Sequence, residues 1–297
     1  MSAVTHLDPN TTHLAGHPDA TGPTRLAAGR RPDPPYGMGL ALAAVTAPTT
    51  AVTLLRDGLL DGPAVMQGSV RGTAAVMLLL ATPALLAAMV STRRGGGKAD
   101  SAILWWLGVT GYLMYNSVLL VFATPFNALY LAYETMLGLS IAGVVVLLRR
   151  LDVTALARRV NARSARPVAV FIAIVALANL AAWLRLIVPA LTQADPAFLV
   201  GTGLITNPVH NQDLAFWIPV ALLIATWLWQ RRPIGLVLAI AYLVYWLLEA
   251  ISVASDQWFG ATADPASTVA TMGGAYLFAG VAVVTAIPLI AMVRRPT

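Results

Sequence analysis

Long apolar stretches alternate with short polar or charged stretches along most of the chain. Eight stretches are each close to the roughly 20 residues that an α-helix needs to cross about 30 Å of hydrocarbon. Barrel strands are excluded, because they would alternate polar and apolar residues. We therefore expect an all-α bundle of about eight transmembrane helices. The predicted spans are Tyr36 to Leu55, Thr73 to Ser91, Ala102 to Phe122, Ala128 to Leu148, Val168 to Leu191, Asp213 to Gln230, Ile234 to Ser255 and Thr268 to Val293.

The N-terminal residues lack this apolar pattern and are rich in Thr, Pro, Gly, Asp and His. Such a composition is typical of a disordered segment, because it cannot bury enough apolar surface to fold. The sequence therefore predicts a disordered tail over residues 1–35 and a transmembrane domain over residues 36–297. No apolar run precedes Tyr36, so we expect no cleavable signal peptide.

The composition excludes several classes of protein. Of the 297 residues, 58% are hydrophobic and only 11% are charged, against about 25% charged residues in soluble domains. A soluble fold of this size could not cover its surface with so few charges. The absence of cysteine excludes disulfide frameworks, thiolate metal sites and cysteine nucleophiles. No phosphate-binding loop, nucleophile elbow or spanning lysine is present, and we expect no cofactor.

The basic residues predict the orientation of the chain. Most of the 19 lysine and arginine residues lie before the first predicted span or directly after spans two, four, six and eight. The positive-inside rule therefore places both termini in the cytoplasm. We expect an integral protein of the cell membrane. Basic residues at the ends of apolar segments are not a nucleic-acid-binding patch, so the expected partner is the lipid bilayer. The exceptions are Arg56, Arg71 and Arg185.

One arginine-rich segment, Arg149 to Arg166, also carries four apolar residues. This pattern suits a helix that lies along the membrane surface and binds anionic lipid. It suits a plain basic loop equally well.

Two further residue types mark the predicted spans. Prolines within or near span interiors predict kinks or local unwinding. Most tryptophans fall near segment ends, which is typical of an interfacial belt. The prolines concerned are Pro48, Pro83, Pro219 and Pro288.

Polar side chains inside the predicted spans gather at the middle or toward the outer side of the membrane. An ionisable group in a membrane helix is costly and indicates a functional site by default. Helical spacing places Tyr242, Tyr245 and Glu249 on one face. Because lipid tails offer no hydrogen-bond partners, we expect such faces to turn inward and line a cavity open to the outside.

Arg185 is the centre of the predicted site. Its guanidinium stays protonated and needs counter-charges or an anionic ligand, and three carboxylates lie at similar predicted depth. Two interpretations stay open. One is a functional site, either for a small polar or anionic ligand or with a proton-coupled carboxylate. The other is a structural arginine that pairs with a carboxylate or reaches the headgroups. The predicted ligand-binding residues are Arg185, Glu134, Glu249, Asn116, Tyr115, Asn127 and His210.

His210 is the only histidine beyond the N-terminal tail, and it ends the longest outer loop. It could accept a proton near neutral pH or be a hydrogen-bonded structural residue. One histidine with carboxylates is poor evidence for a metal, so we expect none. Asn207 or Asn211 can cap the sixth span. The candidate catalytic residues are His210, Asp213 and Glu249.

The sequence supports three functions, of which the first is a transporter-like or ligand-binding protein with an outward-facing polar cavity. The second is a membrane enzyme that acts on a lipid or envelope precursor at the outer leaflet, using His210 and a carboxylate. The third is a structural or assembly subunit whose polar residues hold helices together. The substrate, the coupling ion and the oligomeric state do not follow from the sequence.

Overall fold

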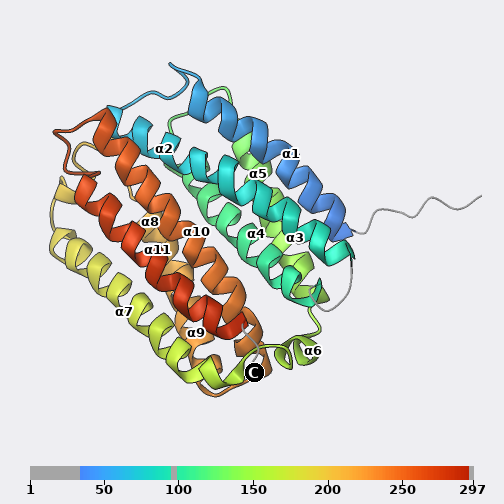
Figure 1. The fold of residues 1–297 in the computed structure, drawn as a ribbon. Helices are drawn as coiled ribbons and strands as arrows, with labels where there is room; N and C mark the ends of the chain where they lie inside the picture. Colours follow the sequence, from blue (N-terminus) through green and yellow to red (C-terminus); the bar gives the residue numbers. More distant parts are fainter. Residues whose placement is uncertain (1–33, 95–98, 294–297) are drawn as a thin grey trace, which may run out of the picture. The chain divides into compact units, whose positions relative to one another are not determined.

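The computed structural model describes residues 34–94 and 99–293, which form helices and connecting loops without any strand. Eight helical stretches in this part of the chain are long and apolar enough to cross a membrane, one for each predicted span. The all-α prediction is therefore confirmed for the described residues, and the chain is compatible with a multi-pass membrane protein (Figure 1). Most of the predicted tail lies outside the described residues, although the first helix already begins at Pro34.

The helices follow one another along the chain, and three of the spans combine more than one element. They are α1 (Pro34–Leu55), α2 (Ala64–Val76), the π-helix η1 (Met77–Ala81), α3 (Thr82–Arg94), α4 (Ala99–Phe122), α5 (Tyr130–Arg150), α6 (Val153–Ala157), η2 (Ala162–Ser164), α7 (Ala165–Ala190), η3 (Ala197–Leu199), α8 (Pro208–Gln212), the π-helix η4 (Asp213–Trp217), α9 (Ile218–Trp229), α10 (Pro233–Ala263) and α11 (Met272–Val293). The second span joins α2, η1 and α3, the fifth joins η2 and α7, and the sixth joins α8, η4 and α9.

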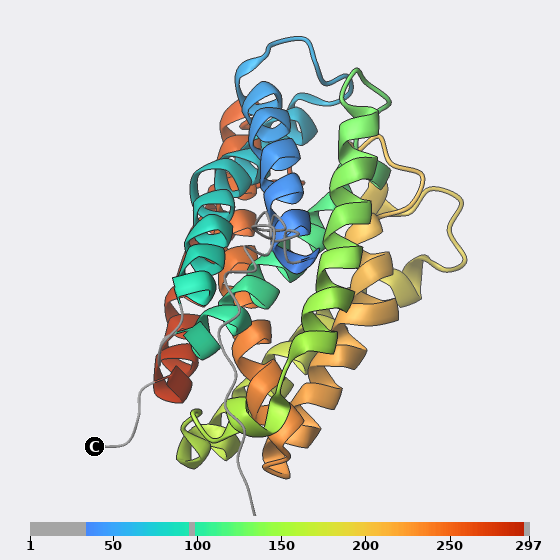
Figure 2. The same cartoon turned by 90° about the vertical axis from the view of Figure 1, so that its right-hand side faces the viewer.

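Helices α4 and α10 form the centre of the bundle. Helix α10 packs against α2, α4, α9 and α11, while α4 also packs against α3 and α5 (Figure 2). In the apolar windows of these two central spans 72% of the residues are buried, against 22% in the span of α7. The outer helices expose large apolar side chains such as Ile174, Leu131 and Val283. This distribution is the one expected of helices that face lipid on the outside and protein in the middle.

The second and seventh spans are longer than predicted, at 31 residues each. Their extra turns carry polar residues such as Gln67 and Gln257, so the apolar signal stops while the helix continues. The extra turns pack against each other, which satisfies their small polar side chains inside the protein. As a consequence Glu249, which lies toward the outer end of the predicted span Ile234 to Ser255, lies near the middle of α10.

Small residues let α2 and α10 approach closely at these turns. A Cβ atom added at Gly72 would lie 2.5 Å from the carbonyl oxygen of Ser255, and one at Gly68 would lie 2.5 Å from that of Phe259. The Ser255 hydroxyl donates to the Gly72 carbonyl at 2.8 Å. Backbone contact through small residues is a common way for membrane helices to associate.

Two of the predicted proline distortions take the form of π-helices. Pro219 follows η4, and Pro83 follows η1. Proline lacks an N–H group and its ring pushes away the carbonyl four residues earlier, so the preceding turn widens. The Ile218 N–H accordingly bonds to the Asp213 carbonyl, five residues back. The prolines of α1 and α11 lie within continuous α-helices.

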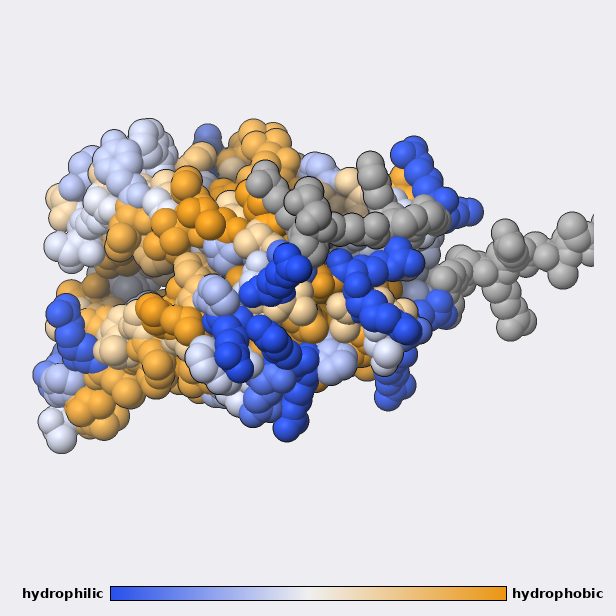
Figure 3. Space-filling view, turned by 60° about the horizontal axis from the view of Figure 1, so that its bottom comes forward, coloured by the Kyte–Doolittle hydropathy of each residue, from blue (hydrophilic) through white to orange (hydrophobic). Residues whose placement is uncertain are grey.

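The arginine-rich segment forms a short helix, α6, that is attached to the bundle. Asp152 caps α6 by accepting from the Ala155 N–H at 3.0 Å, and Leu156 is buried. Asn161 then donates from its backbone to Met292 and from its side chain to the Ala291 carbonyl, both at 3.0 Å. Figure 3 shows hydrophilic residues gathered at this end of the molecule.

Candidate functional site

Asp213 joins three spans through hydrogen bonds. It lies in η4 and is only 5% exposed. Its Oδ1 accepts from the Tyr115 hydroxyl of α4 at 3.1 Å. Its Oδ2 accepts from the Asn179 amide at 3.1 Å and from the Trp183 indole N–H at 2.9 Å, both on α7. All three donors are uncharged.

Glu249 joins α10 to α4. It is 4% exposed, and its Oε2 accepts from the Asn116 amide nitrogen at 2.8 Å. The same amide nitrogen donates to the Tyr112 carbonyl at 3.2 Å, whereas Asn116 Oδ1 is buried without a partner. One turn away, the Tyr112 hydroxyl donates to Ser252 Oγ at 3.0 Å. The two central helices are thus connected by one contact to a carboxyl group and one contact between hydroxyl groups.

Aromatic rings pack between these two acidic sites. The rings of Trp217 and Tyr245 stack at 4.3 Å, and Tyr115 lies 5.6 Å from the first and 5.8 Å from the second. Tyr115, which donates to Asp213, is next to Asn116, which donates to Glu249, so α4 holds the two acids in one site. We define the carboxylate cluster by these two acids and their donors: Asp213, Glu249, Tyr115, Asn116, Asn179 and Trp183.

The carboxylate cluster contains no basic side chain. Within residues 34–94 and 99–293, the ion pair formed is Arg71 to Asp57 at 2.9 Å, outside the cluster. A buried charge is costly unless it is neutralised or paired. Uncharged donors stabilise the Asp213 carboxylate only in part. No positive charge of the cluster balances the two acids, and a bound proton or another cation would do so.

The cluster does not resemble a metal centre. No group of three or more His, Cys, Asp or Glu side chains suited to a metal ion occurs in the described part of the chain. Ca²⁺ and Mg²⁺ bind through several oxygen ligands, whereas the partners of Asp213 are all N–H or O–H donors.

Arg185 is exposed on α7 and forms no ion pair in the described residues, so the pairing considered from the sequence is not made. Trp183 is turned toward Asp213. Two residues along an α-helix correspond to a rotation of about 200°, which places Arg185 on nearly the opposite side of α7. Arg185 and the carboxylates lie at similar predicted depths, which suggested an ion pair. The Arg185 side chain lies on the side of α7 away from Asp213, so that pair does not form.

Glu134 and Asn127 belong to α5 and its start, and they make local contacts. Glu134 is half-buried and accepts from the Tyr130 hydroxyl at 2.8 Å. Asn127 Oδ1 accepts from the Leu129 N–H at 2.9 Å, just before α5 begins. The structure therefore does not bring these two residues together with Asp213 and Glu249.

His210 is buried in α8 between two aromatic rings. Its ring centroid lies 4.3 Å from that of Trp183 and 5.2 Å from that of Phe198. Its Nδ1 has no partner, and among the described residues no carboxylate is hydrogen-bonded to it. The acid–base pair that the enzyme hypothesis requires is therefore not formed. Asn207 caps α8 through the Val209 N–H at 2.9 Å, which confirms the predicted cap.

Two tryptophans of the site are not among the predicted residues. Trp183 donates to Asp213, and Trp217 packs against Tyr115. The signal was helical spacing, because Trp183 follows Asn179 by four residues and Trp217 follows Asp213 by four residues. Residues four apart share a helix face.

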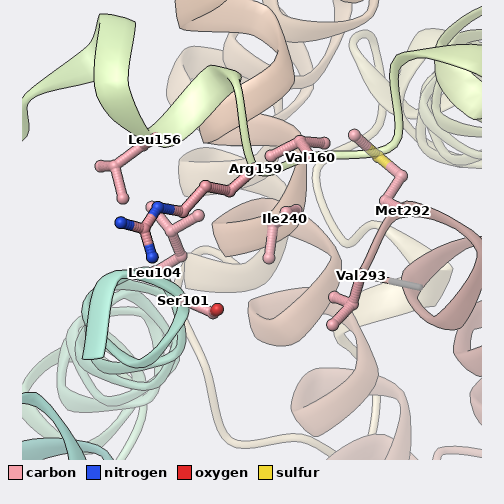
Figure 4. Close-up of a pocket in the computed structure, with 8 residues that line it drawn as sticks. All are labelled: Ser101, Leu104, Leu156, Arg159, Val160, Ile240, Met292 and Val293. Atoms are coloured by element: carbon pink, nitrogen blue, oxygen red, sulfur yellow. The ribbon is translucent and has the colours of Figure 1, made fainter. Parts of the chain in front are cut away.

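A pocket of about 20 Å³ lies elsewhere, near the starts of α4 and α10 and beside α6 (Figure 4). That volume holds about one water molecule. Its lining comprises Ser101, Leu104, Leu156, Arg159, Val160, Ile240, Met292 and Val293. It contains no residue of the carboxylate cluster, so it is not the predicted outward-facing cavity.

Sequence and fold comparisons add no relative from which a role could be transferred, and what the cluster does rests on its own chemistry. The chain matches no known family, no curated protein and no solved structure.

Proposed function

We propose that this protein is a transporter of the cell membrane in which Asp213 and Glu249 bind a cationic species. Both termini are cytoplasmic in this proposal, because the arginine-rich end of the bundle carries α6 and the exposed arginines beside it. The single observation that carries the proposal is the pair of buried carboxylates without a basic partner in the described residues.

The cost of burying carboxylates favours a functional role over a purely structural one. Ionisable residues inside a membrane bundle commonly mark ion and substrate pathways. Helix association alone does not require them, since Tyr112 and Ser252 join the same two helices without charge. Two acids within one site are therefore better explained by a cation that they bind.

The π-helix η4 is a position at which the backbone beside Asp213 can change conformation. Asp213 begins η4, and π-turns inside α-helices are frequent at functional sites. Transporters often carry their binding residues at interrupted helices. A change between π and α geometry would rotate Asp213 relative to α9 and so open its contacts with α4 and α7.

The acidic character of the cluster selects the class of ligand. The sequence favoured a polar or anionic ligand because Arg185 was expected in the site. With Arg185 on the opposite side of α7, the two carboxylates favour a cation instead.

Cysteine accessibility tests the proposal, because the chain has no native cysteine. We expect Ser252→Cys, one turn from Glu249, to react with a membrane-impermeant thiol reagent from both sides of the membrane, in right-side-out and in inside-out vesicles. Alternating access exposes a central site to each side in turn, whereas a structural subunit keeps it closed. Labelling from neither side, or from one side only, would contradict transport.

Three matched variants calibrate this experiment. Thr206→Cys, in the exposed outer loop, should react from outside only, and Thr154→Cys, exposed on α6, from inside only. Ile174→Cys, 61% exposed on the apolar side of α7, should react from neither side, because a thiol in hydrocarbon does not form the reactive thiolate. The reverse result for Thr206 and Thr154 would invert the proposed orientation.

A further inference from the structure

One fully buried polar atom of the carboxylate cluster, Asn116 Oδ1, has no hydrogen-bond partner among the described residues. Asn116 is 1% exposed and its amide nitrogen points at Glu249, yet its Oδ1 is buried and accepts no hydrogen bond. Buried polar atoms are nearly always satisfied in native proteins, and an exception needs a physical explanation. An unused acceptor beside a carboxylate is such an exception.

We propose that Glu249 and Asn116 form a proton-binding site, and that the proton is the coupling ion of the transporter proposed above. In the deprotonated state the carboxylate accepts from the amide nitrogen, through the contact that the structure holds at 2.8 Å. In the protonated state the amide rotates, and Asn116 Oδ1 accepts from the new carboxyl O–H. The two states use the two ends of one amide, which accounts for the unused acceptor.

The proton-binding step is balanced and needs no other reactant. A proton from water adds to a carboxylate oxygen of Glu249, an O–H bond forms, and the charge of the site falls from −1 to 0. Rotation of the amide gives up two bonds of its nitrogen. One is to the Glu249 oxygen, which protonation neutralises, and the other is to the carbonyl of Tyr112, four residues earlier in the same helix.

The ligand set favours a proton over a metal cation. A metal ion in a buried site needs several oxygen ligands. Here Glu249 accepts from one amide nitrogen. Asp213 accepts from a hydroxyl, an amide nitrogen and an indole nitrogen. Hydrogen-bond donors stabilise a carboxylate but compete with a metal for its oxygens.

The groups that face Glu249 are acids and phenols. Asp213 of η4 and Asp256 of α10 interact with it electrostatically, as do Tyr112 and Tyr115 of α4 and Tyr245 of α10. Helices α9 and α11 contribute no charged residue, and the single charged residue of α2, Arg71, is paired with Asp57. Titration of Glu249 therefore occurs next to two other acids, and no described basic residue neighbours it.

Infrared difference spectroscopy tests this inference. The full chain in lipid nanodiscs is compared between acidic and alkaline pH, in sodium chloride and in choline chloride. We expect a carbonyl-stretch band of a protonated carboxyl that grows as the pH falls, is independent of sodium, and loses a component in Glu249→Gln. Glu134→Gln is the matched control, because this acid lies on α5 outside the cluster, and it should leave that component unchanged.

A second variant keeps the test decisive if Glu249→Gln folds poorly. Asn116→Leu removes the donor to the carboxylate and the acceptor for the carboxyl O–H. The bond to the ionised carboxylate is the stronger of the two, so the Glu249 component should remain while its midpoint moves to higher pH. A band that Glu249→Gln does not alter, a midpoint that Asn116→Leu does not move, or a response to sodium in place of pH would overturn the inference. If the band responds to sodium and Ser252→Cys is labelled from both sides, the transporter proposal holds and the proton is not its coupling ion. If the band is intact but Ser252→Cys is not labelled from both sides, Glu249 binds a proton and the transporter proposal is wrong.

Discussion

Asp213→Ala should lower the free energy of unfolding by about 2–3 kcal/mol, because it removes the acceptor of three donors. Tyr115, Asn179 and Trp183 would each keep a polar hydrogen in a buried or half-buried site without a partner. Leaving a buried donor unsatisfied costs about 1–3 kcal/mol each, although single hydrogen bonds in membrane proteins contribute less, about 0.6 kcal/mol on average. Equilibrium unfolding in mixed micelles, followed by tryptophan fluorescence, measures the loss.

Two control variants show whether the effect belongs to the cluster. Asp213→Asn keeps one acceptor oxygen and should lose roughly half as much stability. Asp195→Ala, in the exposed loop between α7 and η3, should change the unfolding free energy by less than about 0.5 kcal/mol. If Asp213→Ala is no less stable than Asp195→Ala, the three hydrogen bonds do not hold these helices together.

Gly72→Ala should destabilise the protein by about 1–3 kcal/mol, because it overpacks the contact between α2 and α10. The added methyl group would lie 2.5 Å from the backbone carbonyl oxygen of Ser255, which cannot rotate away as a side chain can. The Ser255 hydroxyl also bonds to the Gly72 carbonyl, so a shift of the helices would strain that bond as well. Thermal unfolding in detergent measures the effect.

Gly280→Ala is the matched control for this substitution. Gly280 lies in α11 and an added Cβ would have no atom within 4 Å. The same chemical change there should leave stability unchanged or raise it by up to about 1 kcal/mol, since alanine favours helix more than glycine does. Equal losses at Gly72 and Gly280 would mean that the close approach of α2 and α10 is not a source of stability.

The number and type of the spans could be predicted from the sequence, because a continuous apolar run of about 20 residues has few structural solutions in a membrane. The ends of α2 and α10 could not. The first turns of α2 and the last turns of α10 are stabilised by packing between residues almost 190 positions apart, such as Ser69 and Asp256, rather than by apolar composition.

The candidate site was predictable in part, for a different reason. Periodicity placed Glu249 on a polar face of its span, and Asp213 at the start of another, and both are buried. Which residues meet them depends on how each helix is rotated, and a charge gives no information on that rotation. Arg185 therefore appeared central, whereas Asn179 and Trp183, on a different side of the same helix, are the residues that reach Asp213.

Magnetic resonance in lipid bilayers tests the central claim most directly, by measuring the dipolar coupling between the ¹³C carboxyl of Glu249 and the ¹⁵N side chain of Asn116. The amide nitrogen lies 2.8 Å from the carboxylate oxygen, so a strong coupling is expected at alkaline pH and none in Asn116→Leu. A coupling of the Glu249 carboxyl to an arginine guanidinium in place of Asn116 would show a conventional ion pair, and the proposed cation site would be wrong.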